Sequence, residues 1–269
     1  MKAVVLARGK GTRMQRADEG TPLSEAQRRA AESGMKAMMP LRRPFLDYVL
    51  SALADAGVRD VCLVIGPEHG IVRDYYTTEA PPMRLRVSFA IQDEARGTAD
   101  AVLAAEAFAG SDPFLVLNAD NYYPVAIYRG LAALDGPGLP AFSRDALLRE
   151  SNFDAERVRS FAILTVAPTG DLLDVVEKPA ADTFDALARG DVLVSMNIWR
   201  FDRSIFAACR AIGPSPRGEL ELPNAVRHAV QVLGQRFRTF RVEAGVLDVS
   251  RRGDVAEVER RLAMVMPRP

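Results

Sequence analysis

The chain has 269 residues, and its 35 basic and 35 acidic side chains leave no formal net charge. This length is enough to bury the core of one large domain or two small ones. Because no overall field favours nucleic acid or an anionic membrane, we expect neither as a partner. The N-terminus has no secretory signal pattern and no apolar run is long enough to span a membrane, which predicts a soluble, cytoplasmic protein.

Apolar runs alternate with helical patterns through the first half of the chain. Strands are predicted at 3–7, 61–65, 87–91 and 114–117, and helices at 45–56, 69–76 and 99–108. Such alternation favours an α/β fold with a mainly parallel central sheet and helices on both of its faces.

The second half is more mixed. A hairpin is predicted at 162–166 and 172–176, further strands at 192–201, 237–242 and 246–249, and helices at 203–211, 222–233 and 255–265. The segment 137–140 is rich in glycine and proline and is predicted to be a loop. No repeat or linker is evident, so we expect residues 1–269 to form a single domain.

A glycine-rich loop follows the first predicted strand. Gly9 and Gly11 allow a tight turn and a close approach of the backbone to a ligand. Exposed N–H groups in such a loop form a concavity that binds anions, and Lys10 and Arg13 add positive charge. The arrangement predicts a nucleotide as the first ligand, although an ordinary strand-to-helix turn is the alternative.

Two further segments suit a nucleotide site. Gln92 can hydrogen-bond the edge of a base through its amide, and Gly97 permits a close backbone approach. Thr98 can cap the helix that follows, and capping alone would account for it. Asp120 comes after a predicted strand, as the glycine loop does. Since ligands gather at the carboxyl ends of parallel strands, both can share one cleft.

These segments, in their order along the chain, resemble the motifs of the sugar-phosphate nucleotidyltransferases. Residues 6–14 resemble L-A-(G/A)-G-x-G-T-R-(M/L), residues 36–41 resemble K-x-(L/M)-x-P, residues 92–99 match Q-x-x-x-x-G-T-A, and residues 115–120 resemble L-V-x-x-(G/A)-D. Later segments add E-K-P at 177–179, S-M-G-I-Y-x-F-D at 195–202, R-G-E-(L/Y)-(E/Q) at 217–221 and W-x-D-x-G-T near 248. The resemblance implies a Rossmann-like, three-layer α/β/α nucleotidyltransferase fold, similar to the GT-A fold, with a mixed, mainly parallel sheet.

The resemblance also implies roles for individual residues. Arg13, Lys36 and Asp120 would be catalytic, with Lys36 on the α-phosphate, and Asp120 and Asp248 would hold Mg²⁺. Nucleotide-binding residues would be Leu6, Ala7, Arg8, Gly9, Gly11, Thr12, Gln92, Gly97 and Thr98. Residues that bind the sugar phosphate would be Asn121, Glu177, Lys178, Ser195 and Asn197. Glu219 and Glu221 are expected to be structural.

The chain departs from the family pattern at several positions. Arg8 stands where the family has a small residue, and Asn197 and Ser250 stand where it has glycine. An insertion at 22–33 predicts a helix capped by Ser24, placed near the nucleotide where it could act as a lid. The departures fall mostly on the sugar side.

The expected activity is magnesium-dependent transfer of a nucleoside monophosphate from an NTP to a sugar 1-phosphate, giving an NDP-sugar and pyrophosphate. Residues 1–125 would mainly bind the nucleotide, residues 126–250 the sugar phosphate, and residues 251–269 would form a terminal helix. The alternatives are a cytidylyltransferase for another phosphorylated alcohol, a related glycosyltransferase, and a non-catalytic regulatory homologue. The base, the acceptor and the oligomeric state stay open; the resemblance allows a homo-oligomer.

Overall fold

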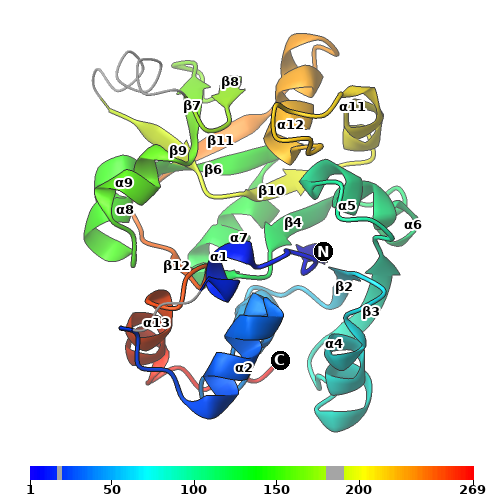
Figure 1. The fold of residues 1–269 in the computed structure, drawn as a ribbon. Coiled ribbons are helices and arrows are strands. Elements are labelled where there is room, and N and C mark those ends of the chain that lie inside the picture. The colour runs from blue at the N-terminus through cyan, green and yellow to red at the C-terminus, as the bar shows by residue number, and fades with distance from the viewer. Residues whose placement is uncertain (17–19, 180–190) are drawn as a thin grey trace.

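The computed structural model describes residues 1–16, 20–179 and 191–269. Within them, a mixed ten-stranded sheet runs in the order β3-β2-β1-β4-β10-β6-β9-β7-β8, and β11 pairs with β6 (Figure 1). No helix in this part of the chain has the length and apolarity needed to cross a membrane.

The first half of the sheet is parallel and confirms the strands predicted there. It consists of β1 (Lys2–Leu6), β2 (Asp60–Ile65), β3 (Arg86–Ile91) and β4 (Phe114–Asn118). Side chains of β1 point alternately into two buried clusters, Ala3 and Val5 into one and Val4 and Leu6 into the other. Burial on both faces is why β1, β2 and β4 are nearly continuous apolar runs.

The second half of the sheet is mostly antiparallel. Its strands are β6 (Gly138–Ser143), β7 (Ala162–Val166), β8 (Leu172–Val176), β9 (Leu193–Ser195), β10 (Ile198–Phe201) and β11 (Arg238–Val242). The two halves join where β10 runs antiparallel to β4. A separate ladder pairs β5 (Asn121–Tyr122) with β12 (Leu247–Asp248), which brings Asp248 beside the end of β4.

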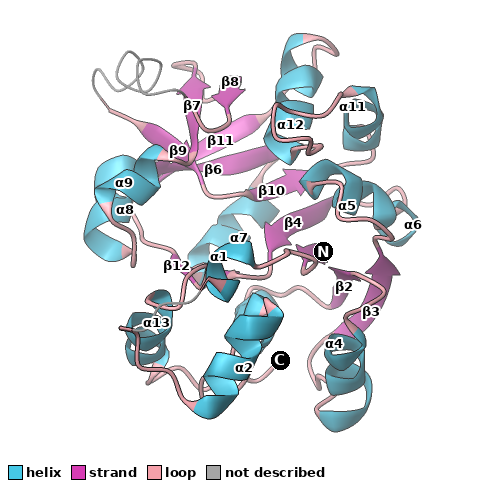
Figure 2. Cartoon of the chain, in the orientation of Figure 1, coloured by secondary structure: helices cyan, strands magenta, loops and turns pink. Residues whose placement is uncertain are grey.

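Helices cover both faces of the sheet and give the three predicted layers (Figures 1 and 2). The first half contains α1 (Thr12–Gln15), α2 (Glu25–Ser33), the 3-10 turn η1 (Lys36–Met38), α3 (Phe45–Asp55), α4 (Gly70–Asp74), the π turn η2 (Tyr75–Glu79), α5 (Thr98–Ala104) and α6 (Glu106–Ala109). The second half contains α7 (Val125–Ala133), α8 (Arg144–Glu150), α9 (Ala155–Arg159), α11 (Ile205–Ala211), α12 (Leu222–Gln231) and α13 (Asp254–Leu262). Helices α3, α7 and α13 bury side chains in one cluster, and α5, α11 and α12 in the other.

Two sequence predictions about strands are wrong. The loop predicted at 137–140 is the start of β6, whose residues are all buried, and Pro140 lies in it opposite Phe240. The single strand predicted at 192–201 is interrupted before Asn197, which has a φ of 54° and cannot continue a strand. In both cases the packing of distant strands decides the local structure.

Candidate active site

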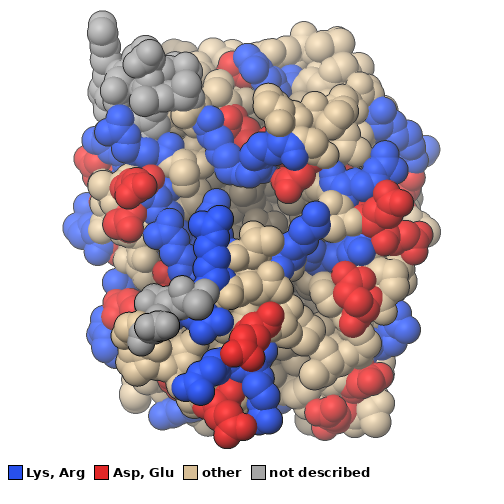
Figure 3. Space-filling view, viewed as in Figure 1, with Lys and Arg blue, Asp and Glu red and all other residues tan. Residues whose placement is uncertain are grey.

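A cavity of about 580 Å³ opens at the carboxyl ends of β1 and β4, where the two halves of the sheet meet. Figure 3 shows a hollow in the middle of this face with Lys and Arg side chains around it. Among the predicted site residues, those that line the cavity are Leu6, Ala7, Arg8, Gly9, Gly11, Thr12, Arg13, Lys36, Gln92, Gly97, Thr98, Asp120, Glu177, Lys178 and Asn197. Segments far apart in the sequence therefore meet at one site, as expected for the glycine loop and Asp120 from their places after strand ends.

Asn121, Ser195 and Asp248 are not among the described residues that line the cavity. Their exposed fractions are 4%, 2% and 7%, so they lie in the surrounding protein. The side chain of Asn121 donates from Nδ2 to Oδ2 of Asp248 at 2.8 Å, which places both behind Asp120. The structure thus makes Asn121 a partner of Asp248 rather than a group on the cavity surface.

The glycine loop is supported from below by the inserted segment. Gly11 has a φ of 62° and precedes α1, and Gly34, with a φ of 74°, ends α2. A Cβ on Gly34 would lie 2.6 Å from the carbonyl oxygen of Lys10, so only glycine fits there. The N–H of Lys36 donates to the carbonyl of Gly34 at 2.9 Å. Gly34 therefore contacts the glycine loop and also positions Lys36.

Helix α2 has the predicted cap but not the expected place as a lid. Ser24 and Gln27 form a full capping box, in which each side chain accepts from the other residue's backbone N–H. Gln27 also donates from Nε2 to the carbonyl of Pro40 at 3.1 Å. No residue of α2 is found among the described residues that line the cavity, because the helix packs beside α1 and η1 instead.

Lys36 and Asp120 form an ion pair at one end of the cavity. Their side chains are only 18% and 16% exposed. Burial would lower the pKa of Lys36, but the adjacent carboxylate of Asp120, and more distantly that of Asp248, outweigh it and raise that pKa. Lys36 is therefore a fixed cation beside the phosphate loop.

Behind Asp120 lies a buried ionic cluster that sequence analysis missed. Arg157, on α9, donates from Nη2 to Asp248 and from Nη1 to Oδ1 of Asp254 at 2.8 Å. Burial and the charge of Asp120 raise the pKa of Asp248 to about 6, against the opposing charges of Arg157 and Lys36. No motif marked Arg157, because its role depends on carboxylates that lie more than 90 residues away in the chain.

On the nucleotide side, the loop that contains Gly97 is held by residues before α12. Thr98 was predicted to cap the helix that follows it, but it does not cap α5. Its Oγ1 instead accepts the N–H of Leu222, the first residue of α12, at 2.8 Å. Gly97 has a φ of 124°, and a Cβ there would lie 2.6 Å from the N of Leu220. Gly97 thus allows the close approach of another backbone segment of the protein.

The second half of the chain contributes charged and amide side chains to the cavity. Burial raises the pKa of Glu177, although Lys178, 3.6 Å away, lowers it. Lys178 and Asn197 are the non-glycine residues with positive φ among those described, at 44° and 54°. Asn tolerates this conformation better than most residues, which explains how it can replace the family's glycine.

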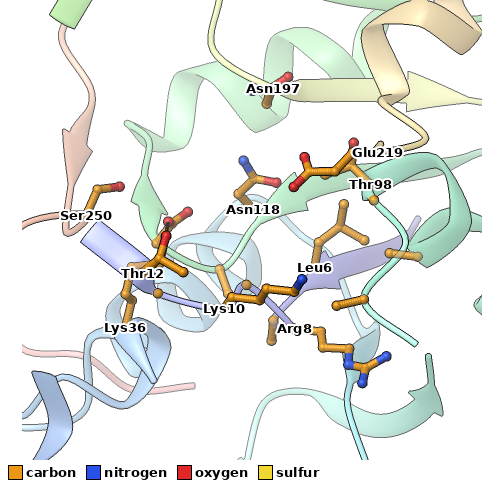
Figure 4. Close-up of a pocket in the computed structure, with 18 of the residues that line it drawn as sticks. Leu6, Arg8, Lys10, Thr12, Lys36, Thr98, Asn118, Asn197, Glu219 and Ser250 are labelled. Carbon is orange, nitrogen blue, oxygen red and sulfur yellow. Dashed lines mark hydrogen bonds and ion pairs between the residues drawn. The ribbon is translucent and has the colours of Figure 1, made fainter. Parts of the chain in front are cut away.

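Several cavity residues were not predicted as site residues. Asn118, Ser160, Phe161, Arg217 and Glu219 all line the cavity. In Figure 4 the carboxylate of Glu219 points toward Asn118 across the cavity, below Asn197. Glu219 was expected to be structural, and it does accept from Arg217 at 2.9 Å, but it also reaches the cavity surface.

Comparisons with known proteins identify the family of this chain. Residues 2–249 match the model of the family described as Nucleotidyl transferase. Glucose-1-phosphate thymidylyltransferase of Streptomyces antibioticus is 28% identical over 97% of this chain, which spans 65% of that protein, just under two thirds of its length. UTP–glucose-1-phosphate uridylyltransferase AglF of Haloferax volcanii is 26% identical over 97% of this chain and 96% of its own length.

A solved structure shares the fold. UDP-glucose pyrophosphorylase complexed with UDP-glucose superposes with a TM-score of 0.73 over 97% of this chain and 98% of that chain, at 18% sequence identity. Since the family match covers all but the ends of the sequence, the chain belongs to the nucleotidyl transferase family.

Proposed function

We propose that this protein transfers a nucleoside monophosphate from an NTP to a sugar 1-phosphate, giving an NDP-sugar and pyrophosphate. The observation that carries the proposal is the Lys36–Asp120 ion pair beside the glycine loop, in a cavity that also contains Glu177 and Lys178. The names of the thymidylyltransferase and uridylyltransferase relatives support the same reaction class.

Different residues of the cavity would bind different parts of the two substrates. Backbone N–H groups of the glycine loop, together with Arg13, would bind the triphosphate, and Lys36 would offset charge on the α-phosphate. Lys178, also on the cavity surface, would hold the acceptor's phosphate, and Glu177 would hold its hydroxyl groups. The phosphate oxygen of the acceptor attacks the α-phosphorus in line, the bond to the β-phosphate oxygen breaks, and pyrophosphate leaves.

Asp120, which lines the cavity, would hold Mg²⁺. Asp248 does not line the cavity, and its Oδ1 and Oδ2 accept from Arg157 and Asn121, but its negative charge lies close enough to interact with that of Asp120. No group of three or more His, Cys, Asp or Glu in the described ranges could hold a metal alone. Mg²⁺ commonly takes one or two carboxylates and completes its shell with phosphate oxygens and water. When bound, it would neutralise phosphate charge and orient the triphosphate.

The two halves of the chain would act as one unit. The pairing of β4 with β10 makes one continuous sheet, and the cavity takes residues from both sides of that junction. We therefore propose a single nucleotidyltransferase domain over residues 1–269, working on NTP and sugar 1-phosphate in the cytoplasm.

Pyrophosphate release tests the proposal. Purified protein with Mg²⁺ is assayed against a matrix of NTPs and sugar 1-phosphates, and release is expected when one NTP and one sugar 1-phosphate are present together. Asp120→Asn should abolish release, whereas Asp112→Asn, whose side chain is 64% exposed on the surface, should leave it unchanged. Full activity of Asp120→Asn would contradict the assigned role, and no release from any combination would contradict the function.

A further inference from the structure

We propose that Tyr123 is a positioning residue, whose buried hydroxyl holds the peptide between Met196 and Asn197 in the orientation that places Asn197 on the cavity. The inference rests on the proposed function, because it concerns how the site presents a side chain to the acceptor. It starts from a position where this chain has asparagine in a left-handed conformation, in place of the glycine of the family pattern.

The peptide between Met196 and Asn197 lies in the break between two strands. Strand β9 ends at Ser195 and β10 begins at Ile198. Among the strand pairings of the described residues, neither Met196 nor Asn197 has a partner. Met196 is only 4% exposed, so its backbone groups need hydrogen bonds from outside the sheet.

Two side chains hold the polar atoms of this peptide. The hydroxyl of Tyr123 donates to the carbonyl of Met196 at 2.5 Å. The N–H of Asn197 donates to Oγ of Ser195 at 3.3 Å. Because the carbonyl and the N–H belong to one planar unit, the two hydrogen bonds together fix its orientation, and we call them the peptide lock.

The peptide lock opposes a conformational preference of Asn197. Its φ of 54° lies in the left-handed region, which costs energy for any residue with a Cβ, although asparagine tolerates it better than most. Rotation of the peptide by about half a turn would return Asn197 to a negative φ. The same rotation would break both hydrogen bonds of the peptide lock, which therefore offset the strain and keep Asn197 in place.

Tyr123 is itself held rigidly. Its side chain is fully buried. Its ring packs edge-to-face against that of Tyr128, with the centroids 6.0 Å apart, and lies tilted against that of Phe142 at 6.5 Å. The hydroxyl therefore has one direction in which to donate, which is toward the carbonyl of Met196.

Tyr123 also connects two sides of the cavity. It comes three residues after Asp120, which pairs with Lys36. Figure 4 shows Asn197 beyond Asn118 and apart from Lys36. The amide of Asn197 can donate and accept hydrogen bonds, as the hydroxyl groups of a sugar require. One short segment thus supplies the Asp120 carboxylate and fixes an amide on the acceptor side.

The experiment measures kcat and both KM values for wild-type protein and Tyr123→Phe, which removes only the hydroxyl. The KM for sugar 1-phosphate should rise by about tenfold, while kcat and the KM for NTP change by less than about twofold. Tyr128→Phe is the matched control in the same aromatic cluster. Its hydroxyl lies near the Tyr123 backbone but makes no hydrogen bond of normal geometry to a described residue, so all three constants should stay unchanged.

A second variant separates the peptide lock from a general effect on the fold. Asn197→Gly adopts a positive φ without strain but has no amide side chain, so it should raise the KM for sugar 1-phosphate by itself. Adding Tyr123→Phe to it should then raise this KM by less than about twofold further. If the two increases instead multiply, Tyr123 acts independently of Asn197 and the inference is overturned.

Crystal structures of the variants provide a readout that needs no turnover. In Tyr123→Phe the φ of Asn197 should become negative, whereas in Tyr128→Phe it should stay positive. A φ that stays positive in Tyr123→Phe refutes the peptide lock, and an unchanged KM for sugar 1-phosphate refutes the positioning role. Either result leaves the transferase function standing. If wild-type protein turns over no pair of substrates, the proposed function fails, and the φ of Asn197 then decides the peptide lock separately.

Discussion

Gly11 and Gly34 meet backbone to backbone, one in the phosphate loop and one at the end of the inserted helix α2. A Cβ on Gly11 would lie 2.5 Å from the Cα of Gly34, and both residues have positive φ. The end of the inserted helix therefore fixes the position of the phosphate-loop backbone in the cavity. The inserted segment thus supports the backbone of the phosphate loop, and the sequence motif of the loop alone does not reveal this contact.

We expect Gly34→Ala to destabilise the protein by about 1–3 kcal/mol and to raise the KM for NTP, because the new methyl group displaces the Lys10 carbonyl. Urea denaturation and steady-state kinetics measure the two effects. Gly57→Ala is the matched control, since Gly57 has a φ of 91° but an added methyl group there would meet no atom within 4 Å. It should lose stability without a change in KM.

Lys36→Met should lower kcat by about 10²–10³, with a smaller change in the KM for NTP, because the lost charge acts mainly as the α-phosphate is attacked. Steady-state pyrophosphate release gives both constants. Lys2→Met also removes a lysine from an ion pair, with Asp112 at 2.9 Å, but away from the cavity, and should leave kcat unchanged. Equal losses in the two variants would contradict the role of Lys36.

Arg157→Met should cost about 3–5 kcal/mol of unfolding free energy, because it leaves Asp248 and Asp254 buried without their cation. Urea denaturation measures the change. Arg227 pairs with Asp174 at 2.9 Å but its side chain is 47% exposed, so Arg227→Met should cost less than about 1 kcal/mol. Similar costs would mean that the buried cluster adds little to stability.

The pH dependence of stability should change in Glu177→Gln. Burial raises the folded-state pKa of Glu177 above its ordinary value of 4.5, so the ionised form is disfavoured in the fold. As pH rises from 4.5 through the raised pKa, wild-type protein loses stability that the glutamine variant keeps. Urea unfolding across this range should show the variant gaining relative to wild type and then levelling off.

Glu257 is a control in which the pKa is shifted in the opposite direction. Hydrogen bonds from Arg260 and Arg261 lower its pKa to about 2, so its carboxylate stabilises the fold above pH 4.5 and this contribution is lost as pH falls. Glu257→Gln should therefore lose stability relative to wild type at neutral pH and approach it in acid. Because Glu257 is 34% exposed, solvent screening keeps this difference small. If the stability of Glu177→Gln relative to wild type instead fell as pH rises from 4.5, the assigned direction of the Glu177 pKa shift would be contradicted.

The parallel half of the fold could be predicted because its strands are buried on both faces. The apolar runs in β1, β2 and β4 differ by a residue or two from their predicted bounds. The start of β6 could not be predicted, since Gly138 and Pro140 indicate a loop locally and become a strand through pairing with β11. Sequence motifs likewise singled out Lys36 and Asp120, which the structure brings together, but not Arg157, whose ion pairs join distant segments of the chain.

The pairing of β5 with β12 has a consequence for the order of synthesis. A ribosome releases the glycine loop, Lys36 and Asp120 well before Asp248, which comes 127 residues after Asn121. A nascent chain can therefore form the parallel half of the sheet, but it holds only one carboxylate of the acidic pair. Competence to carry out the reaction would then appear late, when β12 reaches β5.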